Sequence, residues 1–239
     1  MRVVSLVPSA TESLRALGIE PVACTRFCEQ PDLPTVGGTK DPDVDAIVGI
    51  EPDLVVVNEE ENRFDDAVRL LDAGIALHSM SPRTVADVGP AVEALAVACH
   101  TSSPPRFAPE AWRAWLATEG ARRATARRAC TFVWRRPWTV ASGTTYGSSV
   151  LGLLGLVNVF DDEPDRYPVV TLDEVAMYDP DVVVLPDEPY PFKVRHEAEV
   201  HEDLPRATTV LVDGRDLFWW GVRTPEAVER LRLRLADSR

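Results

Sequence analysis

Two stretches of the chain, residues 44–60 and 172–188, align without a gap at a constant offset of 128 residues. Six of the 17 aligned positions are identical, including the Pro-Asp pairs at Pro52 and Pro180. Each copy reads as a short helix, a Pro-Asp break and an apolar, β-branched strand that ends on acidic residues. Strands that are apolar on both faces are typical of parallel sheets covered by helices. A repeat of this length indicates a duplicated domain rather than a solenoid.

The duplication predicts an α/β protein of two Rossmann-like lobes, each a parallel sheet flanked by helices. We place the first lobe at 1–104 and the second at 129–239. Between them, a segment with helical spacing starts at Pro109 and ends in a cluster of arginines, which complements the C-terminal end of a helix dipole. We therefore expect one long, rigid connecting helix over residues 105–128. At the N-terminus, a strand over Val3–Val7 is followed by Ser9 and Glu12, whose spacing has the form of a capping box.

The charge balance excludes two classes of partner. The 239-residue chain carries 25 basic and 38 acidic residues, a formal net charge of −13. Nucleic-acid binding and adhesion to anionic membranes both depend on basic side chains, so we expect neither partner. No stretch approaches the ~20 consecutive apolar residues of a membrane span, so we expect no membrane insertion.

The first residues predict a location. After Met1 and Arg2, only a five-residue run precedes Pro8, which is too short for the apolar core of a signal peptide. No lipoprotein-type cysteine is present, and we therefore expect a cytoplasmic protein, with export as the alternative if a leader was removed. In that compartment the four cysteines, Cys24, Cys28, Cys99 and Cys130, are expected to be thiols rather than a disulfide framework.

Several motifs, taken together and in order, resemble a known family. They are Ser5-Leu-Val-Pro-Ser-Ala-Thr-Glu12, Val36-Gly-Gly-Thr-Lys40, Glu51-Pro-Asp-Leu-Val-Val-Val57, Asn58-Glu-Glu-Glu-Asn-Arg63, Pro189-Tyr-Pro-Phe192 and Leu211-Val-Asp-Gly214. The chain resembles the helical-backbone (class III) substrate-binding proteins of ABC importers, in the cobalamin-binding-like or helical backbone metal receptor branch. The resemblance implies two α/β lobes joined by one long helix, a ligand held in the cleft between them, and an ABC permease as partner if the protein is exported.

Ligands of open parallel sheets bind beyond the carboxyl ends of the strands, which selects candidate residues without reference to any family. In the first lobe these are Pro8, Ser9, Thr11, Cys28, Glu29, Asn58, Glu59, Glu60 and Arg63. In the second half they are Arg135, Trp138, Tyr146, Glu188, Tyr190, Trp219, Trp220 and Arg223. Aromatic and arginine side chains that face carboxylates suit a flat, polar-edged ligand such as a corrinoid or a chelated metal.

Simpler structural roles compete at several of these positions. Ser9 and Glu12 are explained by a helix cap, and the acidic run 59–61 by the solvated start of a helix. Cys28 is the single candidate metal ligand, but the family stretch that it resembles often carries His where this chain has Gln30, and Cys-x-Gln is a poorer soft-metal pair. Trp219 and Trp220 cannot share one face of a strand, so we expect one at the site and one in the core.

Two classes of function follow. The first is a protein that captures a corrinoid, a metal chelate or another metal complex between its lobes without chemistry. The second is a cytosolic, biosynthetic enzyme, or an intracellular carrier or sensor, that reuses the same cleft. The sequence carries no nucleophile-elbow, P-loop or dinucleotide-binding motif, so we expect no catalytic residues and favour ligand capture.

Overall fold

The computed structural model describes residues 1–122 and 126–236. They divide into two units, each described here by itself. The first unit comprises Met1–Pro82, Ala86–Trp112 and Trp220–Arg223, and the second comprises Arg83–Val85, Arg113–Trp219 and Thr224–Arg239. Within the described ranges, no helix combines the length and the apolar composition needed to cross a membrane.

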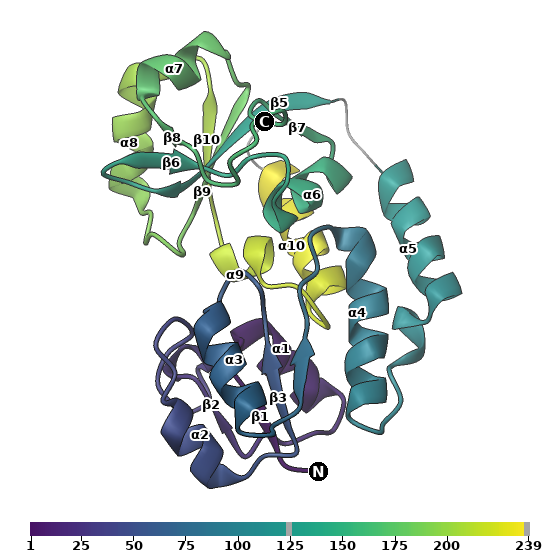
Figure 1. Cartoon of the computed structure of the whole chain (residues 1–239). Helices are drawn as coiled ribbons and strands as arrows, with labels where there is room; N and C mark the ends of the chain where they lie inside the picture. Colours follow the sequence, from purple (N-terminus) through teal and green to yellow (C-terminus); the bar gives the residue numbers. More distant parts are fainter. Residues whose placement is uncertain (123–125, 237–239) are drawn as a thin grey trace. The chain divides into compact units, whose positions relative to one another are not determined.

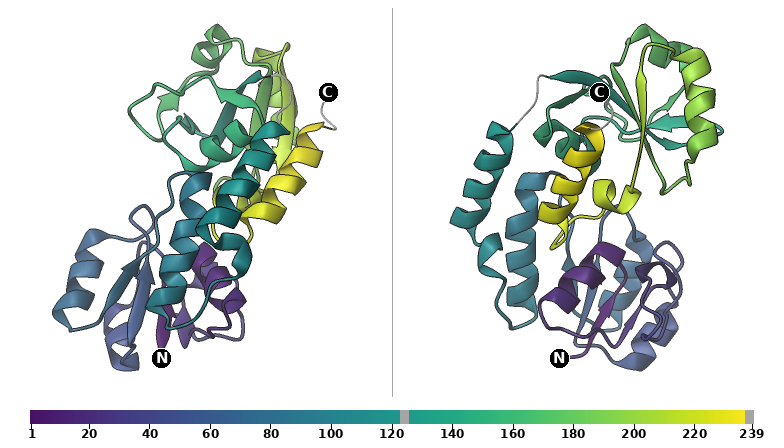
Figure 2. Two further views of the ribbon diagram at one scale, coloured as in Figure 1. Left: turned by 90° about the vertical axis from the view of Figure 1, so that its right-hand side faces the viewer. Right: turned by 180° about the vertical axis from the view of Figure 1, so that it is seen from behind.

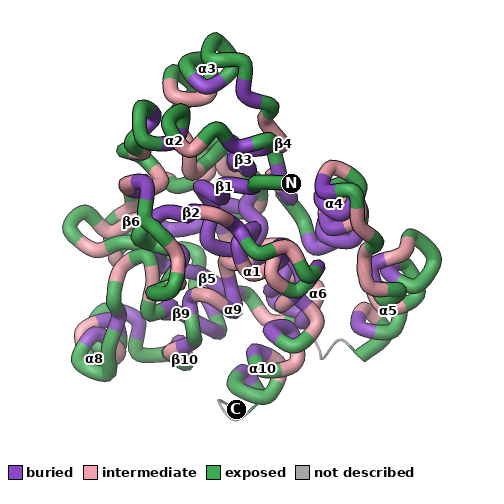
Figure 3. The backbone as a smooth tube through the Cα atoms, turned by 90° about the horizontal axis from the view of Figure 1, so that it is seen from below, coloured by how far each residue is buried: buried purple, intermediate pink, exposed green. Residues whose placement is uncertain are grey.

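The first unit is built on a parallel sheet with strand order β2-β1-β3-β4. Its strands are β1 (Val3–Ser5), β2 (Ala23–Cys24), β3 (Leu54–Val57) and β4 (Leu77–Ser79). Every residue of β1 and β3 is buried (Figure 3), which agrees with their uninterrupted apolar sequences. The sheet therefore forms the middle layer of this unit.

Helices cover both faces of this sheet. α3 lies in front of the strands in Figure 1, and α1 lies in front of them when the unit is seen from behind in Figure 2. The elements are α1 (Pro8–Ala16), the 3-10 turn η1 (Arg26–Cys28), α2 (Val44–Ile50), α3 (Phe64–Asp72), α4 (Val85–Ala98) and the 3-10 turn η2 (Pro105–Phe107). The core between the sheet and these helices includes Val4, Ile47, Val55 and Leu70.

The second unit contains a mixed sheet with the path β10-β9-β5-β6-β8, and β7 also pairs with β5. Its strands are β5 (Arg127–Trp134), β6 (Trp138–Val140), β7 (Leu156–Asn158), β8 (Val169–Val170), β9 (Val182–Pro186) and β10 (Thr208–Val212). β7, β9 and β10 join in parallel, whereas β6 and β8 form an antiparallel extension at the end of β5. The helices are α6 (Tyr146–Leu153), α7 (Leu172–Met177), α8 (Val194–Asp203), α9 (Gly214–Phe218) and α10 (Thr224–Ala236).

The structure confirms the internal repeat. α2 begins at Val44 and α7 at Leu172, and β3 begins at Leu54 and β9 at Val182, so both pairs differ by the offset of 128 seen in the sequence. The parallel strands β2-β1-β3-β4 have the same order as β7-β5-β9-β10 in the second unit. The predicted fold class, an α/β protein with parallel strands and flanking helices in each of two units, is therefore correct, and the antiparallel strands β6 and β8 are an addition that the sequence did not predict.

The helix expected over 105–128 is shorter in the structure. α5 spans Pro109–Ala121, the segment 105–107 is the 3-10 turn η2, and residues 123–125 lie outside the described residues. Arg127 and Arg128, assigned from the sequence to a helix end, begin β5 instead. There the guanidinium group of Arg128 donates to the carbonyl oxygen of Tyr178 at 2.6 Å. Tyr178 is the C-cap residue of α7, so Arg128 binds the C-terminal end of that helix rather than the end of the expected connecting helix.

Candidate functional site

The predicted capping box at the start of α1 is wrong. The N-cap residue is Val7, no side chain caps the helix, and Pro8 occupies the first turn. Proline is favoured there because its fixed φ suits the helix and its missing N–H would have no partner. The helix thus begins two residues earlier than the capping box requires, and the buried Ser9 already lies within it.

Thr11 connects α1 to the loop after β2. Its side chain is fully buried, and its Oγ1 lies 2.8 Å from Ser5 Oγ, 3.0 Å from the Val7 carbonyl oxygen and 3.1 Å from Cys28 Sγ. A threonine hydroxyl carries one proton, so it donates to only one of these acceptors at a time. The hydroxyl group of Thr11, a candidate ligand residue from the sequence, therefore contacts groups of the protein itself.

Cys28 is buried, and its sulfur lies beside the hydroxyl groups of Thr11 and Thr25. Its Sγ lies 3.2 Å from Thr25 Oγ1. A hydrogen bond from the thiol of Cys24, opposed by burial and supported by Thr11 and Thr25, lowers the pKa of Cys28. The same contact, together with burial, raises the pKa of Cys24.

Asn58 holds together the acidic turn that follows β3. It is 5% exposed, and its Oδ1 accepts hydrogen bonds from the N–H groups of Glu60 at 2.8 Å and Glu61 at 3.0 Å. Its Nδ2 donates to the carbonyl oxygen of Met80 at 3.0 Å. The acidic run precedes α3, which starts only at Phe64, so the expected helix start at 59–61 is wrong. The turn leaves the Glu59 and Glu60 side chains on the surface.

The remaining candidates of the first lobe lie at its surface. Glu29 is exposed and adopts a left-handed conformation with φ of 53°. Arg63 is the N-cap residue of α3 and is also exposed. Gln30 accepts a hydrogen bond from the guanidinium group of Arg15. Among the residues that the structure describes, no group of three or more His, Cys, Asp or Glu side chains could hold a metal ion, so the proposed metal role of Cys28 gains no partners there.

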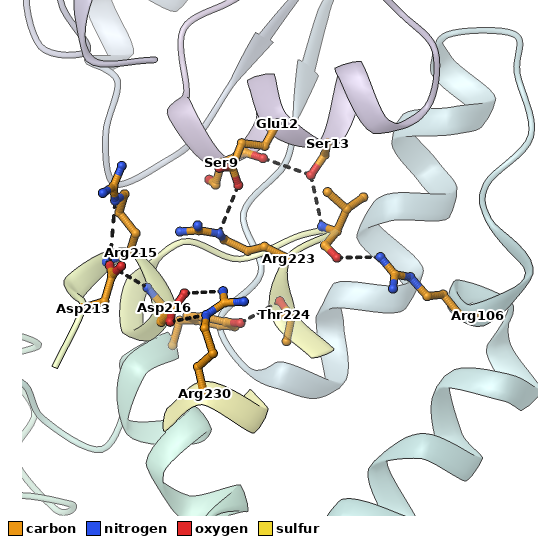
Figure 4. Close-up of polar contacts among 12 residues, drawn as sticks. Ser9, Glu12, Ser13, Arg106, Asp213, Arg215, Asp216, Arg223, Thr224 and Arg230 are labelled. Atoms are coloured by element: carbon orange, nitrogen blue, oxygen red, sulfur yellow. Dashed lines mark hydrogen bonds and ion pairs between the residues drawn. The ribbon is translucent and has the colours of Figure 1, made fainter. Parts of the chain in front are cut away.

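Trp220 to Arg223, distant in sequence, belong to the first unit and pack on α1 (Figure 4). The Val222 N–H donates to Ser13 Oγ at 3.3 Å, and Arg223 Nε lies 3.1 Å from Glu12 Oε2. Gly221 adopts φ of 105°, and a Cβ atom there would lie 2.2 Å from Ser13 Oγ. The segment is therefore fitted closely to the first turns of α1, with Arg223 paired to a carboxylate.

In the second unit, Glu188 lies where β9 ends, against the turn that follows β10. A Cβ atom on Gly214 would lie 2.6 Å from the Glu188 carbonyl oxygen, so only glycine fits there. The Gly214 N–H donates to Asp187 Oδ1 at 2.7 Å. Burial raises the pKa of Glu188, while a hydrogen bond from Trp219 and the charge of Arg215 act in the opposite direction. Glu188 and Trp219, both predicted site residues, are thus brought into contact.

Three further candidates of the second lobe meet in one aromatic cluster. The Arg135 guanidinium lies 5.6 Å from the ring centroid of Trp138 and donates through Nε to Glu199 Oε1 at 3.1 Å. Trp138 and Tyr190 both pack against Phe192, at centroid distances of 6.2 and 4.7 Å. The cluster belongs to the core of the second unit, so much of the Trp138 ring serves packing.

Trp134 extends this cluster to the surface, although the sequence did not select it. It is 46% exposed, and its ring meets the edge of Tyr190 at a centroid distance of 5.6 Å. The alternation of side chains along β5 places Trp134 on the same face as the fully buried Phe132. Trp134 is the last residue of β5, and a register shift interrupts the pairing of β5 with β6 between these two residues. Such an irregularity leaves no mark in a single sequence.

Tyr146 and His196 have structural roles. Tyr146 is buried, and its hydroxyl lies 2.9 Å from Thr224 Oγ1 at the start of α10. His196 is 2% exposed, and its Nδ1 accepts the N–H of Lys193 at 2.9 Å, which closes the first turn of α8. His196 also packs edge-on against Tyr190.

The expected division of the tryptophan pair agrees with the burial of the side chains. Trp220 is 5% exposed and belongs to the first unit, whereas Trp219 is partly exposed and ends α9 in the second. The first unit carries polar side chains at the carboxyl ends of its parallel strands, and the second unit carries both polar and aromatic ones. In the second unit, Trp134, Tyr190, Glu188 and Trp219 combine exposed aromatic surface with a partly buried carboxyl group.

Curated relatives share about a quarter of the sequence. A vitamin B12-binding protein of Vibrio cholerae is 26% identical over 194 residues, which cover 76% of this chain and 69% of the relative. A vitamin B12-binding protein of Pectobacterium carotovorum is 26% identical over 199 residues, which cover 79% and 72%. The similarity thus extends over most of both chains.

Solved structures share the fold. The periplasmic vitamin B12-binding protein of Vibrio cholerae superposes with a TM-score of 0.81 at 22% identity, covering 99% of this chain and 97% of that one. The periplasmic haem-binding protein of the same organism gives a TM-score of 0.81 at 21% identity, covering 98% of each chain. Relatives with this fold are described as periplasmic, so the expected cytoplasmic location is contradicted.

The family model described as periplasmic binding protein matches residues 3–189. This range includes both copies of the internal repeat and the strand ends that carry Asn58 and Glu188. The match agrees with the resemblance found in the sequence motifs and with the fold of the solved relatives. The chain belongs to the periplasmic binding protein family.

Proposed function

We propose that this protein captures a corrinoid or another planar metal chelate, without chemistry, at the carboxyl-end edges of its parallel sheets. The observation that carries the proposal is the exposed aromatic surface of Trp134 beside Tyr190, at the strand ends of a periplasmic binding protein. Aromatic faces bury large apolar areas and stack on flat ligands. The names of the curated vitamin B12-binding relatives support a corrinoid as the first choice.

Haem is the second candidate, favoured by the fold shared with haem-binding proteins. Haem iron is held in proteins by an axial His, Cys, Met or Tyr side chain. His196 is buried and engaged through Nδ1, and Cys28 is buried among hydroxyl groups. Tyr190 remains the candidate axial ligand at the second unit's edge, which makes haem binding dependent on that one phenol.

The test is a titration of the whole chain with cyanocobalamin, haem and a ferric chelate, followed by absorbance and calorimetry. Replacement of Trp134 or Tyr190 by Ala should weaken corrinoid binding by about tenfold or more, as expected for the loss of a stacked aromatic contact. Leu71→Ala is the matched control, because Leu71 is 55% exposed in the last turn of α3, at the opposite end of that helix from the candidate residue Arg63. A panel in which no compound binds would contradict the proposal.

A membrane permease of the ABC class is the proposed partner, supported by the membership of the periplasmic binding protein family. The two alternatives of a cytosolic enzyme and an intracellular carrier both assumed a cytoplasmic location, which the comparisons contradict. Capture of a detergent-solubilised ABC transporter by the ligand-loaded protein, and not by a sample denatured beforehand, tests the partner. If the ligand binds normally but the transporter is not captured, the proposal of a permease partner is refuted and the proposal of ligand capture stands.

A further inference from the structure

Two basic residues, Lys193 and Arg195, lie at the start of α8, next to the aromatic cluster of the second unit. Both side chains are exposed, and within residues 1–122 and 126–236 neither forms an ion pair. By contrast, Arg135 of the same cluster is paired with Glu199. The segment 189–196 contains no acidic residue, although the whole chain carries a net charge of −13. The start of α8 is therefore a locally basic surface.

The ring of His196 connects these two residues to the exposed aromatic surface. Its Nδ1 accepts the N–H of Lys193 at 2.9 Å, and Arg195 Nε lies 3.2 Å from its Nε2. The same ring packs edge-on against Tyr190 at a centroid distance of 5.6 Å. Tyr190 in turn meets Trp134 at 5.6 Å. Lys193 and Arg195 thus flank a ring that packs directly on the proposed stacking surface.

The guanidinium group of Arg195 keeps its hydrogen-bond donors for a ligand. A neutral imidazole accepts a hydrogen bond at only one of its nitrogens, and Nδ1 of His196 already accepts the Lys193 N–H. Nε2 then carries the ring proton, so the Nε–H of Arg195 faces a second donor instead of an acceptor. Carboxylate and phosphate oxygens are the acceptors that a guanidinium group binds most strongly.

Both positive charges stand where a helix does not favour them. Lys193 is the N-cap residue of α8, and Arg195 is the second residue of the helix. The N-terminal end of a helix carries a partial positive charge, so basic side chains there oppose the helix dipole. Residues that break a local preference are expected at functional sites. The stability of α8 therefore does not explain these two residues.

We propose that Lys193 and Arg195 bind an anionic oxygen group at the edge of the captured chelate and so select anionic ligands. The inference rests on the proposed function, because the chelate must stack on Trp134 and Tyr190 to bring its edge to α8. A corrinoid such as cyanocobalamin offers the phosphodiester of its nucleotide loop, and haem offers its propionate carboxylates. Arginine binds either group through parallel hydrogen bonds, and lysine binds it as a point charge.

Two pairs of ligands that differ in this group test the proposal on the whole chain. Cyanocobalamin is compared with dicyanocobinamide, which lacks the nucleotide loop and its phosphate. Haem is compared with haem dimethyl ester, which lacks the carboxylate charges. In the pair whose chelate is captured, the anionic member should bind about tenfold more tightly, and added salt should reduce that preference. The pair that shows the preference distinguishes a phosphate from a carboxylate.

Variants then assign the preference to residues. Arg195→Gln should weaken binding of the anionic member about tenfold and leave the affinity for its uncharged counterpart unchanged. Lys193→Gln should weaken it less, by about two- to fivefold, because an exposed charge acts without fixed geometry. Arg195→Lys, which keeps the charge, should recover part of the affinity. Arg113→Gln is the matched control, because Arg113 is an exposed arginine of α5 that forms no ion pair among the described residues.

Equal wild-type affinities within each pair would overturn this proposal and leave ligand capture intact. So would unchanged affinity in both Arg195→Gln and Lys193→Gln. An equal loss for both members of a pair in Arg195→Gln would also contradict it, because such a loss indicates damage to the aromatic surface. If none of the four compounds binds, the proposed function fails together with this inference. The wild-type comparison needs no variant, so it holds even where a variant does not fold.

Discussion

Arg128 and Asp181 exchange two hydrogen bonds at the start of the second sheet. The Arg128 N–H donates to Asp181 Oδ2 at 2.7 Å, and the Asp181 N–H donates to the Arg128 carbonyl oxygen at 2.9 Å. Arg2 and Asp53 make the same reciprocal pair in the first unit, at 2.6 and 2.8 Å. The aspartate of the repeated Pro-Asp motif therefore fastens its strand to the neighbouring strand in both units.

The guanidinium groups of Arg2 and Arg128 also make equivalent hydrogen bonds in the two units. Arg2 Nη2 donates to the carbonyl oxygen of Ile50 at 2.8 Å, and Arg128 Nη2 donates to that of Tyr178 at 2.6 Å. Ile50 and Tyr178 are equivalent in the repeat, because they lie 128 positions apart. Each arginine thus binds the end of the helix that precedes the second strand of the pair. The duplication has preserved a contact as well as a fold.

Replacement of Asp181 by Ala should lower the free energy of unfolding of the second unit by about 1 kcal/mol, because one hydrogen bond at a strand start is lost. Asp181→Asn keeps an acceptor oxygen at the same place and should retain most of that stability. Urea unfolding followed by circular dichroism measures both variants. Equal losses for Ala and Asn would show that charge, rather than the hydrogen bond, is responsible.

Asn58→Ala should destabilise the first unit by about 2–3 kcal/mol, because it leaves two N–H groups and one carbonyl without their buried partner. Asn58→Asp retains the acceptor but cannot donate to Met80, so an intermediate loss is expected. Denaturant titration of the three proteins gives the comparison. A loss in Asn58→Ala below that of Asn58→Asp would contradict this account.

Gly214→Ala should cost about 1–3 kcal/mol, because the added methyl group meets the backbone of Glu188. Gly152→Ala is the control: it lies in α6, where a Cβ atom meets nothing within 4 Å. That control should be neutral or stabilising, since alanine favours helices. Thermal unfolding distinguishes the two, and equal effects would contradict the close fit at Glu188.

Glu188→Gln should raise stability at neutral pH, because burial raises the pKa of Glu188 and a buried charge costs free energy. For a carboxyl group with a raised folded-state pKa, wild-type stability increases as pH falls through that pKa towards 4.5, the ordinary value. The advantage of the variant should therefore shrink between neutral pH and pH 4.5. Urea midpoints measured across this range check the sign, and an advantage independent of pH would refute it.

His196 should make the second unit less stable in mild acid. Burial and the charges of Arg195 and Arg135 lower its pKa, although Glu199 acts in the opposite direction and Lys193 adds to the lowering. The unfolded chain then takes up a proton near pH 6.5 while the folded protein does not, so stability falls below that pH until the folded-state pKa is reached.

His196→Asn tests this titration, because its Oδ1 can accept the Lys193 N–H without titrating. The stability difference between wild type and variant should decrease steadily from pH 7 to pH 5. Taking the difference removes contributions that the two proteins share, including that of Glu188. A difference that is constant with pH would rule out His196 as the titrating group.

The sequence by itself determined the architecture. The repeat of residues 44–60 at 172–188 predicted both helix–strand pairs and their parallel sheets, because the period of apolar residues and the Pro-Asp break are local signals. It also selected the strand ends at Asn58 and Glu188, since these follow apolar runs directly. The location was not determined in this way: a short apolar start indicated the cytoplasm, and comparison with relatives corrected it.

Only the tertiary structure decided what each side chain does. Trp134, the last residue of β5, is 46% exposed, although the side-chain alternation places it on the same face as the buried Phe132. The segment that includes Arg223 packs on α1 from more than 200 residues away, and its partner is the glutamate expected in a capping box. The stability of such contacts depends on which residues become neighbours in the folded protein. The spacing of residues along the chain does not specify those neighbours.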